Sequence, residues 1–345
     1  MSADTTGLSS VFSFEVNKMP HLPNVSVIVP VKPGGEVKAL ERLRVVDYPV
    51  ERLEVLVAEG RCPSRQRNLA ASGAAGEILY FLDDDSMVSP GFLRRAARHF
   101  VNSDVAAVGG PSLTPPTDTR FQRAVGIALA SLFGGGGARN RYRKDGSARA
   151  TDERELILCN LAFRKSVFLG MGGLDERLYP NEENELMDRI VAAEHLLVHD
   201  PELAVLRSQR PTLKAVFRQF FGYGRGRGEQ TRIGGVRSLV DFLPSLFLLY
   251  LGSAILAGDS AYFLPALCYV AAVLTFSSVN AWQSGEPGAF WPMTAVYPAM
   301  HFSYGAGVLA GLIIPRINRC RDAGGVAVRT VKRMGAPWDS GAGGG

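Results

Sequence analysis

The first two-thirds of the chain alternate between apolar runs and more polar stretches. The apolar runs are short, rich in β-branched residues and end in glycine, proline or acidic residues, as strands buried on both faces of a sheet do. Stretches of helical character separate them. The pattern predicts strands at 24–31, 52–60, 78–82 and 104–112, and helices at 36–46, 64–75 and 89–100. Such alternation predicts an α/β fold, with a mostly parallel sheet that helices cover on both faces.

The last third of the chain is dominated by three long apolar segments. They span 239–257, 261–281 and 295–314, and Asp241 in the first is their one acidic or basic residue apart from a histidine. Each segment is about long enough to cross the ~30 Å hydrocarbon core of a bilayer. The first two are separated by a very short link and therefore predict a helical hairpin. The alternative is three buried core helices, but nothing else in the chain could cover that much apolar surface.

Basic residues flank these segments on both sides. By the positive-inside rule both flanks belong in the cytoplasm, and three full crossings cannot satisfy this requirement. Either one segment is re-entrant or interfacial, or the rule fails here. The N-terminus lacks the basic and apolar regions of a signal peptide. We therefore expect a multi-pass protein of the inner (cytoplasmic) membrane, with its catalytic domain in the cytoplasm.

These patterns divide the chain into five expected parts. They are a flexible leader at 1–23, an α/β catalytic domain at 24–210, a basic, aromatic and glycine-rich interfacial segment at 211–237, about three transmembrane helices at 238–315, and a tail at 316–345 that is basic and then disordered.

Charge and cysteine content narrow the classes of function. The net charge of the 345 residues is +5, an excess too small to make nucleic acid the expected partner, whereas basic segments beside apolar ones suit membrane lipids. The four cysteines, Cys62, Cys159, Cys268 and Cys320, are far apart and form no CxxC-type pair. We therefore expect free thiols rather than a disulfide framework or a zinc site.

Three consecutive aspartates carry the clearest chemical signal. Asp83, Asp84 and Asp85 directly follow the apolar run 78–82, and like charges at the end of a buried strand repel one another. Helix capping explains at most one of them. Ligands of α/β sheets bind at the carboxyl ends of strands, where Glu59 also falls. Because carboxylate oxygens suit Mg²⁺ or Mn²⁺, a divalent cation explains the cluster best.

Several stretches, taken in order, give the chain a family resemblance. They are "VSVIVPV", then "SRQRNLAASGAAGEILYFLDDDS", then "CNLAFRKSVFLGMGGLDERLYPNEENELMDRI". Over about 25–227 the chain resembles family 2 glycosyltransferases of the GT-A fold. The stretch "RQFFGYGRGRG" resembles the membrane-attached, succinoglycan-type exopolysaccharide branch of that family.

The resemblance implies a nucleotide-sugar donor, with a UDP-sugar as the expected one. It also implies Mn²⁺ or Mg²⁺ held by Asp85 and Asp83, bridging the donor phosphates so that the nucleoside diphosphate can leave. Glu59 stands where the family usually has an aspartate contacting the base. The residues assigned to the nucleotide sugar are Pro30, Glu59, Arg65, Arg67, Asn68, Asp83, Asp84, Asn160, Gln219 and Arg225. Without the resemblance, the arginines near residue 65 fit a solvated helix face and Asn160 fits a turn or strand edge.

A second acidic cluster, "NEENEL" at 181–186, begins an expected amphipathic helix. The helix dipole favours acids at its N-terminus by ~0.3–1 kcal/mol each, which accounts for some of them. The resemblance assigns the general base to Glu183, with Glu182 as the second candidate. The base would take the proton from the acceptor hydroxyl as that oxygen attacks the anomeric carbon, in one displacement that inverts the configuration.

Two further segments are candidates for contact with the acceptor or the membrane. Residues 131–155 contain four consecutive glycines, which disfavour a stable helix or strand, followed by Arg139, Arg141 and Arg143. This segment fits either a disordered loop or a mobile lid whose arginines meet the phosphates of a lipid-linked acceptor. Residues 211–237 fit an interfacial helix that glycines would break halfway. A segment that closes over the nucleotide and a plain basic anchor are the two alternatives there.

We therefore expect a membrane-anchored, metal-dependent, inverting glycosyltransferase of the hexosyltransferase type. It would move a sugar to a lipid-linked (polyprenyl) acceptor at the cytoplasmic face, in exopolysaccharide or related cell-surface glycan synthesis. A polyprenyl-phosphate glycosyltransferase is the first alternative. A processive synthase is the second, although about three hydrophobic segments are few for the translocation channel that it would need. A nucleotidyltransferase is an alternative of another class, although "VPVKPGGEVKAL" matches its basic, Gly-rich signature poorly. A membrane scaffold is the non-enzymatic alternative.

Overall fold

The structure is a computed structural model that describes residues 21–258, 260–316, 320 and 324–339. The predicted flexible leader at 1–23 therefore lies almost wholly outside the described residues.

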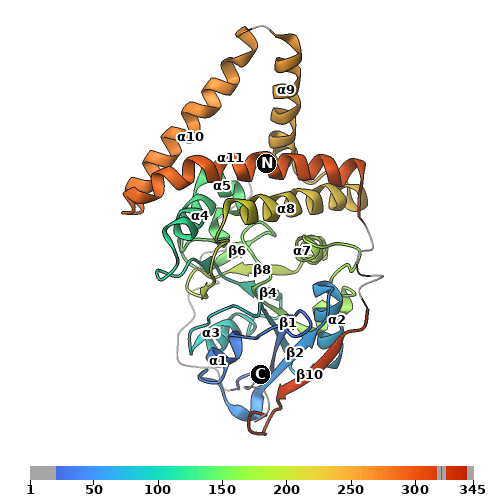
Figure 1. The fold of residues 1–345 in the computed structure, drawn as a ribbon. Helices are drawn as coiled ribbons and strands as arrows, with labels where there is room; N and C mark the ends of the chain where they lie inside the picture. The colour runs from blue at the N-terminus through green and yellow to red at the C-terminus, as the bar shows by residue number, and fades with distance from the viewer. Residues whose placement is uncertain (1–20, 259, 317–319, 321–323, 340–345) are drawn as a thin grey trace, which may run out of the picture.

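Eight strands form a central mixed sheet, and two short strands form a second sheet (Figure 1). The order in the large sheet is β10-β2-β1-β3-β7-β4-β8-β6. Its strands are Val25–Val31 (β1), Leu53–Glu59 (β2), Ile78–Leu82 (β3), Val105–Gly109 (β4), Arg149–Thr151 (β6), Asn160–Arg164 (β7), Leu196–His199 (β8) and Ala327–Lys332 (β10). The second sheet pairs β5 (Ser112–Leu113) with β9 (Val205–Leu206) in parallel.

Most strands of the large sheet run in one direction. β1 is parallel to β2 and β3, and β4 is parallel to β8. β7 lies antiparallel between β3 and β4, and the edge strands β10 and β6 are also antiparallel to their neighbours. The carboxyl ends of β1, β2, β3, β4 and β8 consequently meet at one edge, where sheets of this kind bind ligands. The predicted α/β fold class is confirmed.

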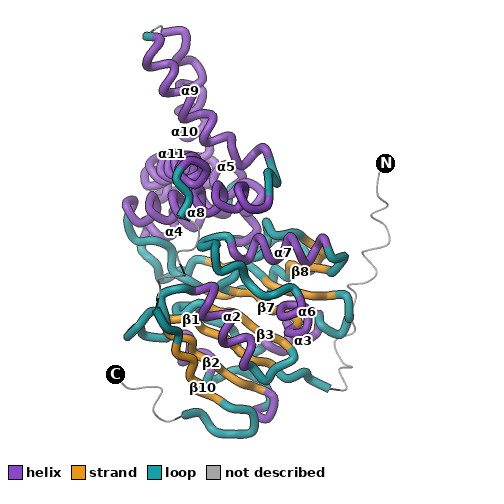
Figure 2. The backbone as a smooth tube through the Cα atoms, turned by 90° about the vertical axis from the view of Figure 1, so that its right-hand side faces the viewer, coloured by secondary structure: helices purple, strands orange, loops and turns teal. Residues whose placement is uncertain are grey.

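Helices cover both faces of this sheet (Figure 2). On one face, α1 and α3 pack against β-branched and aromatic residues of the strands, and on the other face α2, α6 and α7 enclose a second apolar cluster. These helices are Ala39–Leu43 (α1), Pro63–Gly73 (α2), Phe92–His99 (α3), Lys165–Gly170 (α6) and Glu182–Ala192 (α7). Because their apolar sides are buried on the sheet, the strand ends and helix N-termini at its carboxyl edge are held in place.

A layer of helices lies over the carboxyl edge of the sheet. Its members are α4 (Arg120–Ala130), α5 (Leu132–Gly135), α8 (Leu213–Gly234) and α11 (Phe290–Ile313). α8 and α11 run side by side across the top of the catalytic domain (Figure 1). A third apolar cluster joins this layer, with Val216 and Phe220 of α8 packed near Val296 and Met300 of α11.

The pairing of α8 with α11 depends on glycines. α8 is continuous, so the expectation that its glycines break it is wrong. A Cβ at Gly224 would overlap the backbone of Tyr304, and a Cβ at Gly307 would overlap the backbone of Phe221. The two helices therefore pack backbone against backbone, and this contact offsets the roughly 1 kcal/mol that each helical glycine costs relative to alanine.

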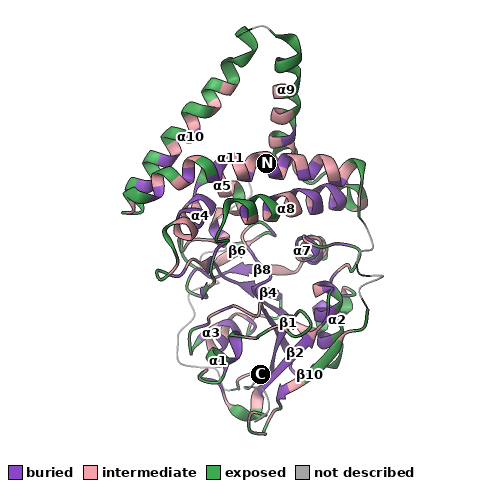
Figure 3. Ribbon diagram, viewed as in Figure 1, coloured by how far each residue is buried: buried purple, intermediate pink, exposed green. Residues whose placement is uncertain are grey.

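Two helices project from this layer as a hairpin, α9 (Leu243–Ala257) and α10 (Leu264–Gln283) (Figure 1). With their leading 3₁₀ turns they form helical spans at Leu239–Ala257 and Ser260–Gln283, with mean hydropathies of 1.9 and 1.7. Both are long and apolar enough to cross a membrane, and both are exposed along most of their length (Figure 3). The third predicted segment forms α11, which lies along α8 across the base of the hairpin.

The C-terminal tail returns to the catalytic domain, and within the final stretch expected to be disordered, residues 335–339 are ordered. β10 pairs with β2, placing Ala327 opposite Glu59. Val331 is 1% exposed, and Trp338 packs against the same core cluster. Edge pairing and burial of the apolar side chains on one face explain why the segment is ordered. Residues 340–345 lie outside the described residues.

The cysteines also differ from the expectation. Cys62 and Cys320 form a disulfide with a Cα–Cα distance of 5.3 Å, and Cys159 and Cys268 are free. The expectation of four free thiols is wrong for the bonded pair. The two residues are 258 positions apart, and they meet because the returning tail passes the N-terminus of α2. Spacing along the sequence carries no sign of this proximity.

We predict that the returning strand contributes to the stability of the catalytic domain. Val331→Ala should lower the free energy of unfolding by about 2 kcal/mol and the Tm by several degrees, because it leaves a cavity under β2. Val328→Ala, on the same strand but 38% exposed, is the matched control and should change the Tm by less than about 1 °C. Equal Tm values for both variants would show that the tail does not pack as described.

Candidate active site

The three aspartates lie at the carboxyl end of β3, at the ligand-binding edge of the sheet. Each has its own contacts. Asp83 is paired with Arg67 at 2.8 Å, Asp85 is paired with Arg207 at 2.7 Å, and the backbone oxygen of Asp84 accepts a hydrogen bond from the N–H of Ala39. Burial, together with the neighbouring carboxylates of Asp85 and Asp83, raises the pKa of Asp84. The like charges are thus kept apart or compensated by arginine.

Arg207 compensates two of the aspartates at once. It follows β9, and its guanidinium contacts Asp83 Oδ2 at 3.1 Å and Asp85 Oδ1 at 2.7 Å. Burial alone would lower the pKa of Arg207, but the carboxylates of Asp83 and Asp85 raise it, and the net pKa lies well above its ordinary value. The pair of carboxylates therefore converges on one position that favours positive charge.

The donor set of Asp83 and Asp85 fits a divalent cation. Both are carboxylates, and both offer oxygens to the same positive group. Mg²⁺ and related ions are commonly held by one or two carboxylates, with substrate phosphates and water completing the shell. Within the described ranges no group of three or more His, Cys, Asp or Glu side chains could hold a metal ion. Substrate phosphates and water would therefore supply the remaining ligands.

Arg67 connects the aspartates to the second acidic cluster. This buried side chain of α2 reaches Asp83 Oδ1 with one nitrogen and Glu182 Oε1 at 3.6 Å with another. Burial, followed by the charge of Glu183, raises the pKa of Glu182 to about 8. Glu182 is therefore mostly protonated at neutral pH, and its Oε2 is buried without a hydrogen-bond partner among the described residues. The arrangement makes Glu182 a link between two sites rather than an accessible base.

Glu183 has a different environment from Glu182. It lies at the N-terminus of α7 and is partly exposed. It lines a cavity of about 840 Å³ between the start of α7 and the helical layer. Between the two candidates for the general base, Glu183 is the one that an acceptor in this cavity could reach.

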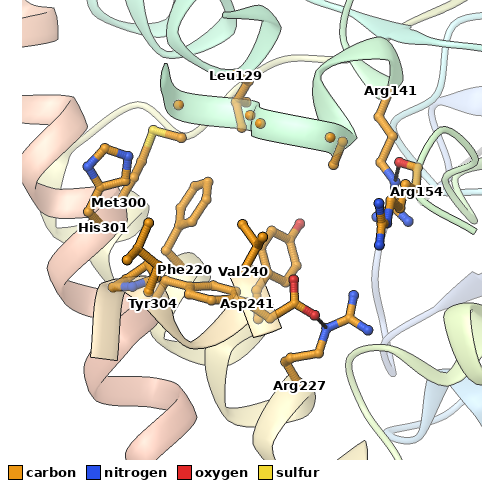
Figure 4. Close-up of a pocket in the computed structure, with 18 of the residues that line it drawn as sticks. Leu129, Arg141, Arg154, Phe220, Arg227, Val240, Asp241, Met300, His301 and Tyr304 are labelled. Atoms are coloured by element: carbon orange, nitrogen blue, oxygen red, sulfur yellow. Dashed lines mark hydrogen bonds and ion pairs between the residues drawn. The ribbon is translucent and has the colours of Figure 1, made fainter. Parts of the chain in front are cut away.

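The cavity is apolar at one end and polar at the other (Figure 4). Met300 and His301 lie at one end, whereas Arg141 and Arg154 lie at the opposite end. Its wall also includes residues from both arms of the hairpin, so that it reaches into the angle between α9 and α10. The apolar lining residues include Leu132, Phe133, Phe220, Leu243, Phe247, Tyr269, Phe276, Met300 and Tyr304.

Three arginines line the cavity, and they differ from the predicted set. Of the predicted ones, Arg141 lines it, and Arg139 and Arg143 are not among its lining residues. Arg143 is instead bonded to Asn140 and Asp145. Arg154 and Arg227 complete the set. Arg154 also lies in the segment 131–155, but an arginine between two acidic residues gave no reason to single it out.

The glycine run before these arginines is ordered. It forms the end of the single-turn α5 and the start of the 3₁₀ turn Gly136–Arg141. Cβ atoms at Gly134 and Gly135 would overlap carbonyl groups at the end of α4, so only glycine permits this close packing. Arg141 then donates a hydrogen bond to Asn184 Oδ1 at 2.7 Å, which joins the segment to α7. The expectation of a disordered loop is therefore wrong for this region, and the mobile lid stays a prediction.

Four other residues predicted to bind the nucleotide sugar lie at strand ends or on α2. Pro30 and Glu59 end β1 and β2 at the ligand edge, and Glu59 accepts a 3.3 Å hydrogen bond from the N–H of Gly34. Arg65 is exposed on α2. Asn68 holds the loop that leads to the predicted catalytic residues Glu182 and Glu183. Its side chain bonds both the N–H and the C=O of Leu174 in that loop.

Three further residues predicted to bind the nucleotide sugar form hydrogen bonds with other protein groups. Asn160 is fully buried, where it accepts from Tyr80 Oη and donates to the carbonyl of Leu203, so it fixes the end of β3. Gln219 bonds Tyr223 on α8. Arg225 bonds the carbonyl of Ile314 at the C-terminus of α11. The structure does not bring Gln219 and Arg225 to the aspartates, because Gln219 bonds within α8 and to Arg210, and Arg225 is turned toward the end of α11.

Comparisons with known proteins bear on the family and the fold. Residues 45–169 match the sequence profile of Glycosyl transferase family 2. Over these residues the chain is similar to family 2 glycosyltransferases. The chain is also 25% identical over 249 residues to the succinoglycan biosynthesis protein ExoA of Rhizobium meliloti (strain 1021), covering 70% of this chain and 71% of that protein. The predicted resemblance to a succinoglycan-type glycosyltransferase is confirmed.

A solved structure shares the fold of this glycosyltransferase. The mannosyltransferase PcManGT from Pyrobaculum calidifontis, in complex with GDP-Man and Mn²⁺, matches with a TM-score of 0.52 and 17% identity. The match covers 85% of this chain and 88% of that one. At this level of identity the likeness supports the GT-A fold and nothing finer.

We predict that Glu182 makes stability depend on pH. Its pKa rises from 4.5 in the unfolded chain to about 8 in the folded one, so between these values the folded protein holds the extra proton. Stability should therefore fall as pH rises from about 5 to 8. Glu182→Gln should flatten this part of a Tm-versus-pH curve, whereas Glu185→Gln, on the same helix, should leave it in place. An unchanged slope in Glu182→Gln would contradict the assignment.

Proposed function

We propose that this glycosyltransferase is metal-dependent, inverting and membrane-anchored, and that it transfers a sugar from a nucleotide donor to a lipid-linked acceptor in exopolysaccharide or related glycan synthesis. The single observation that carries this proposal is the position of the cavity. It joins the predicted base Glu183 to an apolar space between two helices that could cross a membrane.

The donor would bind at the carboxyl edge of the sheet. Asp85 and Asp83 would hold Mn²⁺ or Mg²⁺, which supplies Lewis-acid stabilisation of the departing diphosphate. Arg67 keeps Asp83 in place through a 2.8 Å contact, and Glu59 lies where the base would lie, at the end of β2. A UDP-sugar is the expected donor, and the GDP-Man of the structural neighbour makes a GDP-sugar the alternative to test.

Proton transfer would fall to Glu183. A hydroxyl or phosphate oxygen at the polar end of the cavity would approach Glu183 from one side while the donor lies on the aspartate side. Glu182 is buried against Arg67 and does not reach the cavity lining. A base that takes the acceptor proton during attack needs to reach the acceptor directly, and the lining of the cavity supports Glu183 in that role. Attack from the face opposite the leaving diphosphate would invert the anomeric configuration.

The acceptor would be amphipathic. An isoprenoid chain suits the aromatic and aliphatic end of the cavity, and phosphate groups suit the end with Arg141 and Arg154. Arg154 is exposed in the cavity lining and forms no ion pair among the described residues, so it is available for an anionic group. Arg227 is less available, because Asp241 lies 3.4 Å away.

Two crossings would satisfy the charge distribution on both sides of the membrane segments. If α9 and α10 cross and return while α11 lies along α8, the chain before and after the hairpin is on the same face. Basic residues on both flanks then agree with the positive-inside rule. This arrangement supports a catalytic domain held against the cytoplasmic face.

The first test is calorimetric titration of the detergent-purified protein with UDP, GDP and CDP, each with and without Mn²⁺. We expect one nucleotide to bind tightly only when Mn²⁺ is present. Glu183→Gln should keep this binding but lose transfer by about 10³-fold, because the base has no substitute in the site.

Asp85→Asn is the counterpart of that variant. It should lose the metal-dependent part of binding, because the amide cannot replace the carboxylate charge. Failure of every nucleotide to bind a folded sample would sink the donor assignment. Transfer at the wild-type rate by Glu183→Gln would move the base to Glu182.

We predict that Arg154 contributes to acceptor binding. Arg154→Ala should raise the KM for a polyprenyl diphosphate-linked acceptor about tenfold, the effect of losing a charge-assisted hydrogen bond, with the donor KM unchanged. Arg143→Ala is the matched control, because its side chain is held by Asn140 and Asp145 outside the cavity. If both variants raise the acceptor KM equally, the cavity is not the acceptor site.

A further inference from the structure

One arginine outside the predicted site, Arg207, occupies the position that a donor cation would need. Its guanidinium bridges Asp83 Oδ2 and Asp85 Oδ1, the same two carboxylates that would hold the metal. No signal in the sequence singled it out, because it lies 122 residues after Asp85 in the segment following β9.

The backbone around Arg207 is fixed, so its side chain stays within reach of the aspartates. The adjacent residue Leu206 exchanges two 2.9 Å backbone hydrogen bonds with Met87, which is two residues beyond Asp85. The N–H of Arg207 donates to the carbonyl of Leu113 at 2.9 Å. The position of this side chain is therefore built into the pairing of β9 with its neighbours.

A guanidinium and a divalent cation cannot both occupy this position. The guanidinium already uses one oxygen from each carboxylate, and a cation placed between them would repel it at short range. When metal and donor bind, Arg207 has to move, and the nearest new anion is the diphosphate of the donor. Arginine suits phosphate oxygens because its planar fork can make two parallel hydrogen bonds.

We propose that Arg207 is a positioning residue of the donor site, which holds Asp83 and Asp85 together in the donor-free enzyme and is displaced when metal and nucleoside diphosphate bind. Without nucleotide, a metal ion has to displace Arg207 from the two carboxylates while no diphosphate is present to accept the displaced guanidinium. Binding of the metal and binding of the nucleotide would be coupled through this one side chain. The inference rests on the proposed metal-dependent function.

The test is binding of Mn²⁺ to the full-length protein, followed by electron paramagnetic resonance, with and without the nucleotide that binds in calorimetry. Arg207→Gln should bind Mn²⁺ alone about tenfold more tightly than wild type, because a competing positive charge is gone. The same variant should bind the nucleotide with Mn²⁺ about tenfold more weakly, because a phosphate contact is lost. Changes of opposite sign separate this role from loss of folding, which would weaken both.

Two further variants complete the design. Arg94→Gln also removes an arginine from an arginine–aspartate pair, its partner being Asp47 at 2.9 Å on the outside of α3, and it should change neither affinity. Arg207→Lys keeps the charge and should leave the affinity for Mn²⁺ alone near that of wild type, which keeps the test open if Arg207→Gln does not fold. Unchanged Mn²⁺ binding in Arg207→Gln, with normal nucleotide binding in wild type, would overturn this inference alone. Absence of Mn²⁺ binding in wild type with every nucleotide would overturn the proposed function as well.

Discussion

The close packing of α8 against α11 is the constraint on which the upper half of the molecule depends. Glycines at the contact let the two backbones touch, as at Gly224 and Gly307. Another glycine of α8, Gly226, lies so close to the carbonyl of Pro180 that a Cβ would overlap it. The helical layer is thereby fixed directly over the loop that leads into α7, whose first residues are Glu182 and Glu183. Any larger side chain along this contact would separate the layer from the loop and alter the cavity between them.

Below that contact, the charges form one connected arrangement. Arg67 touches both Asp83 and Glu182, so the end of β3 and the start of α7 share a buried cation. Breaking a buried pair leaves an uncompensated charge, which costs far more than the pair contributes. The arrangement therefore couples the carboxyl edge of the sheet to the start of α7. It also explains how the chain can place three aspartates together after a buried strand. Arg67 and Arg207 compensate the charges of Asp83 and Asp85.

Much of this could be predicted from local sequence, because local patterns have local causes. Apolar runs determine strands such as β1 and β3, and acids after a strand must lie at its carboxyl edge. Contacts between distant segments gave no such signal. The pairing of Cys62 with Cys320 depends on the path of the returning tail. The glycines of α8 suggested a broken helix because the partner that they contact lies about 80 residues further along the chain. For the same reason, Arg225 was assigned to the donor although it caps α11.

The geometry of the hairpin also bears on how a lipid-linked substrate would arrive. The cavity opens into the angle between α9 and α10, whose outer surfaces are largely exposed and apolar. A lipid diffusing in the bilayer could pass into this angle without leaving its hydrocarbon surroundings, so its tail would pay no cost for exposure to water. Its polar head would then meet Arg141 and Arg154 at the other end of the cavity, which Glu183 also lines. The apolar hairpin would in this way serve as an anchor and as one wall of the acceptor site.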